Sequence, residues 1–221
     1  MHCTQYSPRT VLTCAFNQNL LGQPETYKQS SKMISLIGVV AFLFIFLDAN
    51  YFVRIAFTIL FGRIFQSKKK PNEQTAIYGL CTTQDVDIFV RHMNNARYVR
   101  EMDFARFHFY DRTGLYESIV ENKGNALQGA CNIRYRRTIP IFTPYKVITK
   151  LAGWDEKSIY LEQHFVTFDG FIRAVALSKQ NIVGVNVNQM LKDYPKPQQT
   201  LDLTQWLQSI ETSSERLRKD K

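Results

Sequence analysis

The chain has 221 residues, which gives room for one ordinary domain with an appendage but not for two large domains. Hydrophobic residues make up 45% of the chain and aromatic residues 13%, so there is enough apolar surface for a compact core, and wholesale disorder is excluded. The formal net charge of +9 favours anionic partners such as lipid headgroups, nucleic acid or phosphorylated cofactors, without choosing among them.

Within the first 66 residues the chain changes abruptly from polar to apolar at Met33. Residues 1–32 are polar and turn-rich and are predicted to be disordered. From Ile34 to Leu47 the chain holds no charged residue, and this run would span about 21 Å as a helix. Extension to Val53 gives a full bilayer span, so we interpret residues 33–66 as a membrane anchor. A buried core helix and a cleaved signal peptide are the alternatives, and no convincing A-x-A cleavage site supports the second.

The second half of the anchor region, Ile55–Phe61, is a further apolar patch that could lie on the membrane surface. In that arrangement the side chains of Arg54 and Arg63 would extend toward water.

Basic residues are more numerous after the apolar run than before it, which predicts a cytosolic C-terminal domain. Five basic residues follow the run (Arg54, Arg63, Lys68, Lys69, Lys70) and three precede it (Arg9, Lys28, Lys32). Translation from Met33 would strengthen this bias.

The rest of the chain predicts an α+β domain. Residues 67–74 are a charged linker, and residues 75–190 begin with a strand at Ile77–Cys81 and a helix from about Asn95 to Tyr110. Strand-like runs follow, separated by turn signals such as GWDEK and FDG, which suit antiparallel hairpins. These runs are Ala126–Thr138, Lys146–Ala152, Ser158–Thr167 and Phe171–Val183. One helix laid on a sheet is the expected architecture, and residues 191–221 add a C-terminal amphipathic helix and tail.

Several other classes of site have no support. The cysteines form no CxxC pair and have no histidines at ligand spacing, so we expect reduced thiols and no metal site. They are Cys3, Cys14, Cys81 and Cys131. No GxSxG, Walker or zinc signature occurs, no cofactor is predicted, and nucleic-acid binding has only the net charge in its favour.

The segment QDVDIFVRHMNNARYVREMDFARF, from Gln84 to Phe107, places two carboxylates, a histidine and two amides at a helix start. Helix capping alone would explain such residues. The whole string, however, resembles the DxDxxxHxNNxxY motif of hotdog-fold thioesterases of the four-hydroxybenzoyl-CoA type. The resemblance continues through NIRYRRTIP and GWDEKSIYLEQHF, and together with LDANYFVR it is most similar to the animal family called thioesterase superfamily member six.

The resemblance implies a hotdog fold, a long antiparallel sheet wrapped round a central helix, and a homodimer or higher oligomer. It implies that Asp87 is the catalytic nucleophile or general base, and that the Asn95 N–H points at the thioester carbonyl. His92 would orient the acyl group or tune the acid, and Asn94 would shape the turn. Asp85 is the alternative acid if the register differs by two residues.

One departure from the motif is a fourth residue between Asp87 and His92, where the family has three. The segment Ile88–Arg91 could bulge outward, or it could swing the carboxylate away. Coenzyme A phosphates would meet basic residues of the later strand, although solvated sheet charges are the simpler explanation of those residues. The candidates are Arg134, Arg136 and Arg137.

Two functions follow from these observations. The first is an acyl-CoA thioesterase anchored in the endoplasmic reticulum membrane with its C-terminal domain in the cytosol. The second is a non-catalytic hotdog protein that binds a fatty acyl chain or a protein partner at the membrane lipid.

Overall fold

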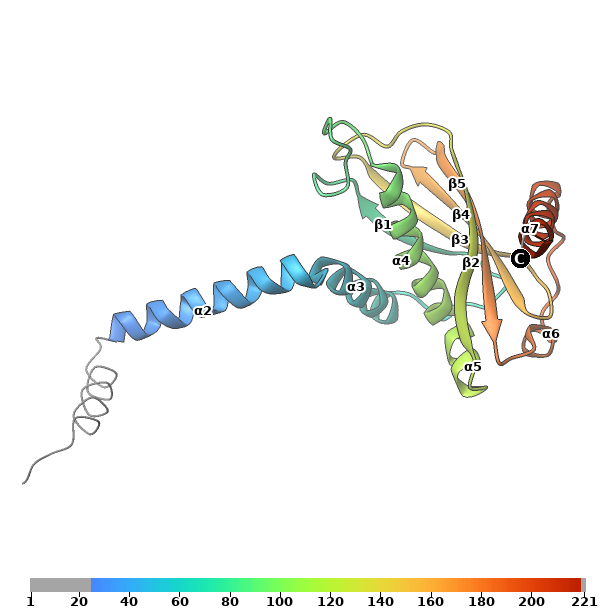
Figure 1. Ribbon diagram of the computed structural model, residues 1–221, viewed down its shortest axis with the longest axis horizontal. Helices are drawn as coiled ribbons and strands as arrows, with labels where there is room; N and C mark the ends of the chain where they lie inside the picture. The colour runs from blue at the N-terminus through green and yellow to red at the C-terminus, as the bar shows by residue number, and fades with distance from the viewer. Residues whose placement is uncertain (1–24, 220–221) are drawn as a thin grey trace, which may run out of the picture. The chain divides into compact units, whose positions relative to one another are not determined.

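The computed structural model describes residues 25–219 of the chain, which divide into two compact units between Val53 and Arg54. The first unit holds helix α2 (Glu25–Phe46) and the first turn of helix α3 (Ala49–Phe65). The second unit holds the remainder of α3 and all of the sheet (Figure 1). Helix α2 therefore includes the last residues of the segment predicted to be disordered, while residues 1–24 lie outside the described part.

Helix α2 has the length and composition of a membrane-spanning helix. Its apolar window runs over 18 residues from Gln29 to Phe46, and none of that window is buried within the protein. It is the one helix among residues 25–219 that meets this description, and the finding concerns length and composition only. Residues 33–46 of this helix belong to the segment that the sequence analysis assigned to an anchor, and the helix begins eight residues before that segment.

The second unit is built on one five-stranded antiparallel sheet with the strand order β1-β3-β4-β5-β2. The expected hairpins are present: Leu151 of β3 lies opposite Leu161 of β4, which in turn lies opposite Ser178 of β5. The strands are β1 (Thr75–Leu80), β2 (Asn125–Tyr135), β3 (Pro144–Trp154), β4 (Ser158–Thr167) and β5 (Ile172–Val183). The predicted α+β hotdog architecture is confirmed.

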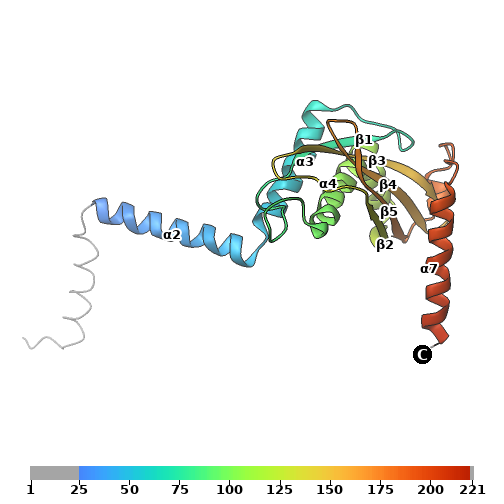
Figure 2. The ribbon, with the colours of Figure 1, turned by 90° about the horizontal axis from the view of Figure 1, so that it is seen from above.

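Helix α4 (Asn95–Thr113) is the central helix of this fold and lies against the sheet (Figures 1 and 2). The predicted stripe is its inner side, because Tyr98, Met102 and Phe109 are each at most 2% exposed. The helix runs three residues beyond the predicted end. It stops at Gly114, whose φ of 71° is a left-handed conformation that glycine adopts without strain.

The two faces of the sheet carry two different cores, as the alternation of side chains along a strand requires. On one face, Leu151, Ile159 and Leu161 pack with Phe109 of α4 and with α5 (Leu115–Glu121) and α6 (Val187–Met190). On the other face, Ala152, Tyr160 and Leu177 pack with Leu203 of α7 (Leu201–Lys219). Helices α4 and α7 therefore cover opposite faces, and the start of α4 remains at one end of the sheet.

Candidate active site

The loop between β1 and α4 carries the predicted acid, Asp87. Val86 and Met93 form an isolated antiparallel bridge, and the Asp87 N–H donates to the His92 carbonyl over 3.0 Å. The Asp87 carboxylate turns back across the loop and accepts hydrogen bonds from the backbone N–H groups of Arg91 and His92, at 3.1 and 3.4 Å. The residues between Asp87 and His92 are thus closed into a small turn by the carboxylate itself.

The extra residue of this loop is accommodated by an outward bulge. Ile88 is 90% exposed and Phe89 67% exposed, and Val90 takes a positive φ of 55°, which is uncommon for a β-branched residue. The three apolar side chains therefore leave the carboxylate uncovered instead of crowding it. Of the two geometries considered for the fourth residue, the structure has the outward one, and Asp87 stays next to His92.

The surroundings of Asp87 favour its charged form. The hydrogen bonds from the N–H groups of Arg91 and then His92 lower the pKa of the carboxyl, so it is ionised at neutral pH. The His92 Nε2 atom lies 3.9 Å from the Asp87 Oδ2 atom, which is close enough for an electrostatic interaction and too long for a hydrogen bond. The His92 Nδ1 atom lies 3.3 Å from the Met93 carbonyl oxygen. Both side chains are half-buried, so they remain accessible to a ligand.

The start of α4 provides hydrogen-bond donors beside this loop. Asn94 is the N-cap, and its side-chain oxygen accepts from the Ala96 N–H at 2.9 Å. The Asn95 N–H makes no hydrogen bond within the part of the chain that the structure describes. The Asn95 carbonyl accepts from the Tyr135 hydroxyl at 3.0 Å, which joins the helix start to the end of β2. The amide of Asn94 is therefore a structural cap, whereas the N–H of Asn95 has no acceptor among residues 25–219.

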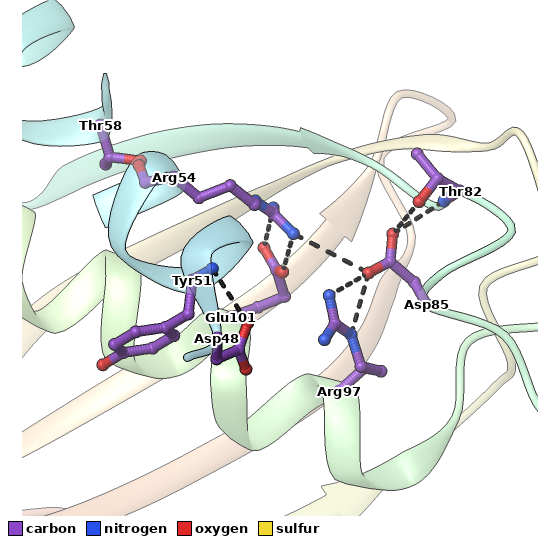
Figure 3. A network of polar contacts seen from close by, with 8 residues as sticks. All are labelled: Asp48, Tyr51, Arg54, Thr58, Thr82, Asp85, Arg97 and Glu101. Atoms are coloured by element: carbon purple, nitrogen blue, oxygen red, sulfur yellow. Dashed lines mark hydrogen bonds and ion pairs between the residues drawn. The ribbon is translucent and has the colours of Figure 1, made fainter. Parts of the chain in front are cut away.

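Asp85, the alternative acid, has a different environment although it lies only two residues earlier. It is 1% exposed, and it accepts from the backbone N–H and hydroxyl of Thr82 at 2.8 and 2.7 Å and from the Arg97 Nε at 2.9 Å (Figure 3). Burial would raise the pKa of this carboxyl, but the hydrogen bonds from Thr82 and Arg97 lower it on balance. With its oxygens occupied by these donors, Asp85 holds the loop and the helix together and has no free side for a substrate.

A second acidic residue that the sequence analysis did not identify, Glu101, belongs to the same network. Its carboxylate is 1% exposed and pairs with Arg54 of α3, with both N–O distances at 2.8 Å (Figure 3). The Arg54 guanidinium also lies 3.8 Å from Asp85 and stacks on Phe104. The expectation that Arg54 extends toward water is therefore wrong. No local pattern links Arg54 to Glu101, because they are 47 residues apart.

The three arginines proposed for coenzyme A lie at the end of β2, where Tyr135 contacts the start of α4. Arg136 and Arg137 stack on Phe171, at 4.9 and 4.6 Å from the ring centre, and the Arg136 Nη1 donates to the Ile172 carbonyl. Arg134 is exposed on the edge strand. The guanidinium groups of Arg136 and Arg137 are thus held in place by the Phe171 ring.

Metal ligands and thiols add nothing to this site. Among residues 25–219, no group of three or more His, Cys, Asp and Glu side chains is placed to hold a metal ion. Cys81 and Cys131 are free thiols, and Cys3 and Cys14 lie outside the described residues. The chemistry available at the helix start is therefore that of a carboxylate, an imidazole and backbone N–H groups.

Comparison with known proteins gives concordant results. A family model described as the thioesterase-like superfamily matches residues 81–209. Protein THEM6 of Drosophila melanogaster is 59% identical over 193 residues, covering 85% of this chain and 100% of that protein. Protein THEM6 of Xenopus laevis is 34% identical over 188 residues, covering 82% of this chain and 90% of that protein.

A solved structure shows the same fold at low sequence identity. A protein from Lactobacillus plantarum, assigned as an oleoyl thioesterase, superposes with a TM-score of 0.50 and 14% identity, covering 56% of this chain and 51% of that one. At this identity the similarity concerns the fold alone.

Proposed function

Because this chain belongs to the thioesterase-like superfamily, as a relative of the THEM6 proteins, we propose that it hydrolyses acyl-CoA thioesters at a membrane with Asp87 as the general base or nucleophile. The observation that carries this proposal is the position of Asp87, an ionised, half-buried carboxylate in the loop that leads into α4 and 3.9 Å from His92. Asp85 offers no such alternative, because its oxygens are already hydrogen-bonded.

The proposed reaction uses groups that meet at the helix start. The Asp87 carboxylate removes a proton from a water molecule, whose oxygen forms a bond to the thioester carbonyl carbon. The oxyanion that develops is stabilised by the Asn95 N–H and the positive end of the helix dipole. Collapse of the tetrahedral intermediate breaks the C–S bond and releases the fatty acid. The thiolate of coenzyme A takes up the proton that Asp87 removed from the water, so the Asp87 carboxylate is restored. Direct attack by Asp87, with an anhydride intermediate that water then hydrolyses, is the alternative that the same geometry supports.

The proposed substrate class follows from the surroundings of the site. Arg134, Arg136 and Arg137 lie at and just beyond the end of β2, whose Tyr135 hydroxyl contacts the helix start, and their charges would suit the phosphates of coenzyme A. The exposed side chains of Ile88, Phe89 and Val90 offer an apolar surface for an acyl chain.

We infer that α2 anchors the protein in the endoplasmic reticulum membrane, with the second unit in the cytosol. The apolar window of α2 and the excess of basic residues after it support this arrangement. Alkaline carbonate should leave the full chain in the membrane pellet, and protease added to sealed microsomes should digest the second unit. Protection of the second unit would contradict the orientation.

The experiment that tests the function is release of free thiol from a panel of acyl-CoA chain lengths by the purified full chain in detergent. We expect hydrolysis of at least one chain length. The second candidate function, acyl-chain binding without turnover, is favoured by the exposed apolar loop Ile88–Val90. Saturable binding of an acyl-CoA with no thiol release across the whole panel would establish that function in place of hydrolysis.

A further inference from the structure

Four large apolar side chains of α3 are mostly exposed, and two of them, Phe57 and Phe61, also line a pocket with Ile77, Tyr78 and His108 of the second unit. Phe57, Leu60, Phe61 and Ile64 follow one another at steps of three, one and three, so they share one side of the helix. They are 65%, 58%, 42% and 63% exposed. We name these four residues the α3 stripe. An apolar surface of this kind on a folded unit usually marks an interaction site.

The opposite side of α3 is fixed to α4, so the stripe cannot turn inward. Arg63 pairs with Asp111 at 2.6 Å, and the Arg112 guanidinium donates to the carbonyls of Gly62 and Gln66 at 3.0 and 2.9 Å. Gly62 lies so close to the His108 ring that a β-carbon there would approach it to 2.9 Å. Together with the Arg54–Glu101 pair, these contacts set which side of the helix faces outward.

The charges beside the stripe indicate what covers it. Lys68, Lys69 and Lys70 begin three residues after the end of α3 and are all exposed, although Lys68 lies 3.6 Å from Glu117 and Lys69 3.5 Å from Glu73. An apolar helix side flanked by lysines is typical of helices that lie in the interface of an anionic membrane. A second observation points the same way: α3 begins three residues after α2 ends, and three residues reach no farther than about 11 Å. If α2 crosses a bilayer, the start of α3 is held at that bilayer's surface.

We propose that the α3 stripe lies in the boundary between headgroups and acyl chains of the bilayer that α2 crosses, with Lys68, Lys69 and Lys70 on its anionic lipids. This inference rests on the membrane anchor of the proposed function. In this arrangement α3 connects the membrane to the second unit without a flexible linker, because hydrogen bonds and ion pairs hold the inner side of α3 against α4. Arg54 of α3 belongs to the same polar network as Asp85, which lies two residues before Asp87. Contact of α3 with the bilayer would therefore also hold the candidate site at a fixed distance from the lipid.

The test uses tryptophan as a depth probe in the full chain. Phe57→Trp and Ile64→Trp place the probe at two points of the stripe, and Leu217→Trp, at a site of similar exposure (59%) on α7, is the matched control. Each variant is reconstituted in phosphatidylcholine–phosphatidylserine vesicles whose acyl chains are brominated or unbrominated. The emission of Trp154 and Trp206 is subtracted with the parent protein. We expect bromine to quench the probe at positions 57 and 64 and not at position 217.

Each other outcome overturns the inference in a recognisable way. If the chain floats with the vesicles but iodide in the water quenches the stripe probes and bromine does not, the stripe faces solvent. If neither quencher acts, protein covers the stripe, as a second copy of the chain would. If the chain fails to float with the vesicles at all, the anchor of the proposed function fails as well. Two probe positions guard against a single variant that disturbs the fold.

Discussion

At the residue scale, Asp85 and Asp87 have the same side chain and different roles, because of what surrounds each carboxylate. Asp85 is enclosed by Thr82 and Arg97, while Asp87 closes an outward bulge and stays half-exposed. Strand alternation would put the two side chains on one face, but β1 ends at Leu80, before Asp85, so the alternation does not apply to them. Asp85 is therefore a structural residue and cannot serve as a neutral control for the chemistry.

Replacing Asp85 by Asn is predicted to destabilise the second unit. The change leaves the Arg97 charge without its buried partner, and loss of one member of such a pair costs about 3–5 kcal/mol. Urea unfolding at pH 7 measures the loss. An unfolding free energy equal to that of the parent would contradict the structural role of Asp85.

The lowered pKa of the Asp85 carboxyl predicts how the loss of unfolding free energy in Asp85→Asn depends on pH. Its folded-state pKa lies below the unfolded value of about 3.9, so it stabilises the fold above that pH. The stabilisation is lost as pH falls through the folded pKa. The difference in unfolding free energy between parent and Asp85→Asn should therefore be constant above about pH 5 and shrink below about pH 4. A difference that grows on acidification would contradict the assignment.

At the element scale, the contact between α3 and α4 depends on the buried pair Arg54–Glu101. Burial raises the pKa of the Glu101 carboxyl, with Arg54 acting against that rise. In Arg54→Met the carboxyl loses this partner, so the variant should be less stable at pH 7. The penalty should diminish as pH falls through the raised folded pKa toward the unfolded value of about 4.3, because the protonated acid is tolerated.

A double-mutant cycle isolates this pair from the rest of the interface. The combined variant Arg54→Met/Glu101→Met leaves no buried charge, so it should recover stability relative to either single variant, with a coupling energy on the order of 0.5–3 kcal/mol. Chemical denaturation of the four proteins gives the value. Additive losses would show that the two side chains do not interact.

The elements that could be predicted are those with a local pattern. The periodic apolar residues of α4 and the turns GWDEK and FDG give the helix and the hairpins, and β4 matches its predicted bounds. The catalytic candidates came from a motif. The structure places the Asp87 carboxylate 3.9 Å from the His92 ring and makes Asn95 the first residue of α4. The Arg54–Glu101 pair could not be predicted, because a contact between distant residues leaves no periodic signal in either segment. The direction of the Ile88–Val90 bulge depended on hydrogen bonds that the sequence does not show.

At the scale of the whole molecule, the sheet ends in β2, a long strand at its edge. An edge strand of 11 residues exposes unpaired backbone groups, and proteins usually cover such an edge. We predict that the full chain is a dimer in detergent at micromolar concentration, as measured by light scattering corrected for detergent. Leu127→Lys on β2 should weaken the dimer, and Leu217→Lys, at a similarly exposed site on α7, should not. A parent protein that is monomeric would contradict this prediction.

The central claim is that the Asp87 carboxylate performs the chemistry, and the most direct measurement compares acyl-CoA hydrolysis by the parent, Asp87→Asn and Asp103→Asn. Asn keeps the size of Asp87 and one oxygen for the Arg91 N–H, so the thermal unfolding curve should not change. Asp103 is a partly exposed acid on α4 that pairs with Arg106, which makes it the matched control. We predict that Asp87→Asn lowers the turnover number by about 10²–10⁴ while Asp103→Asn retains the parent rate. A parent rate retained by correctly folded Asp87→Asn would contradict the account.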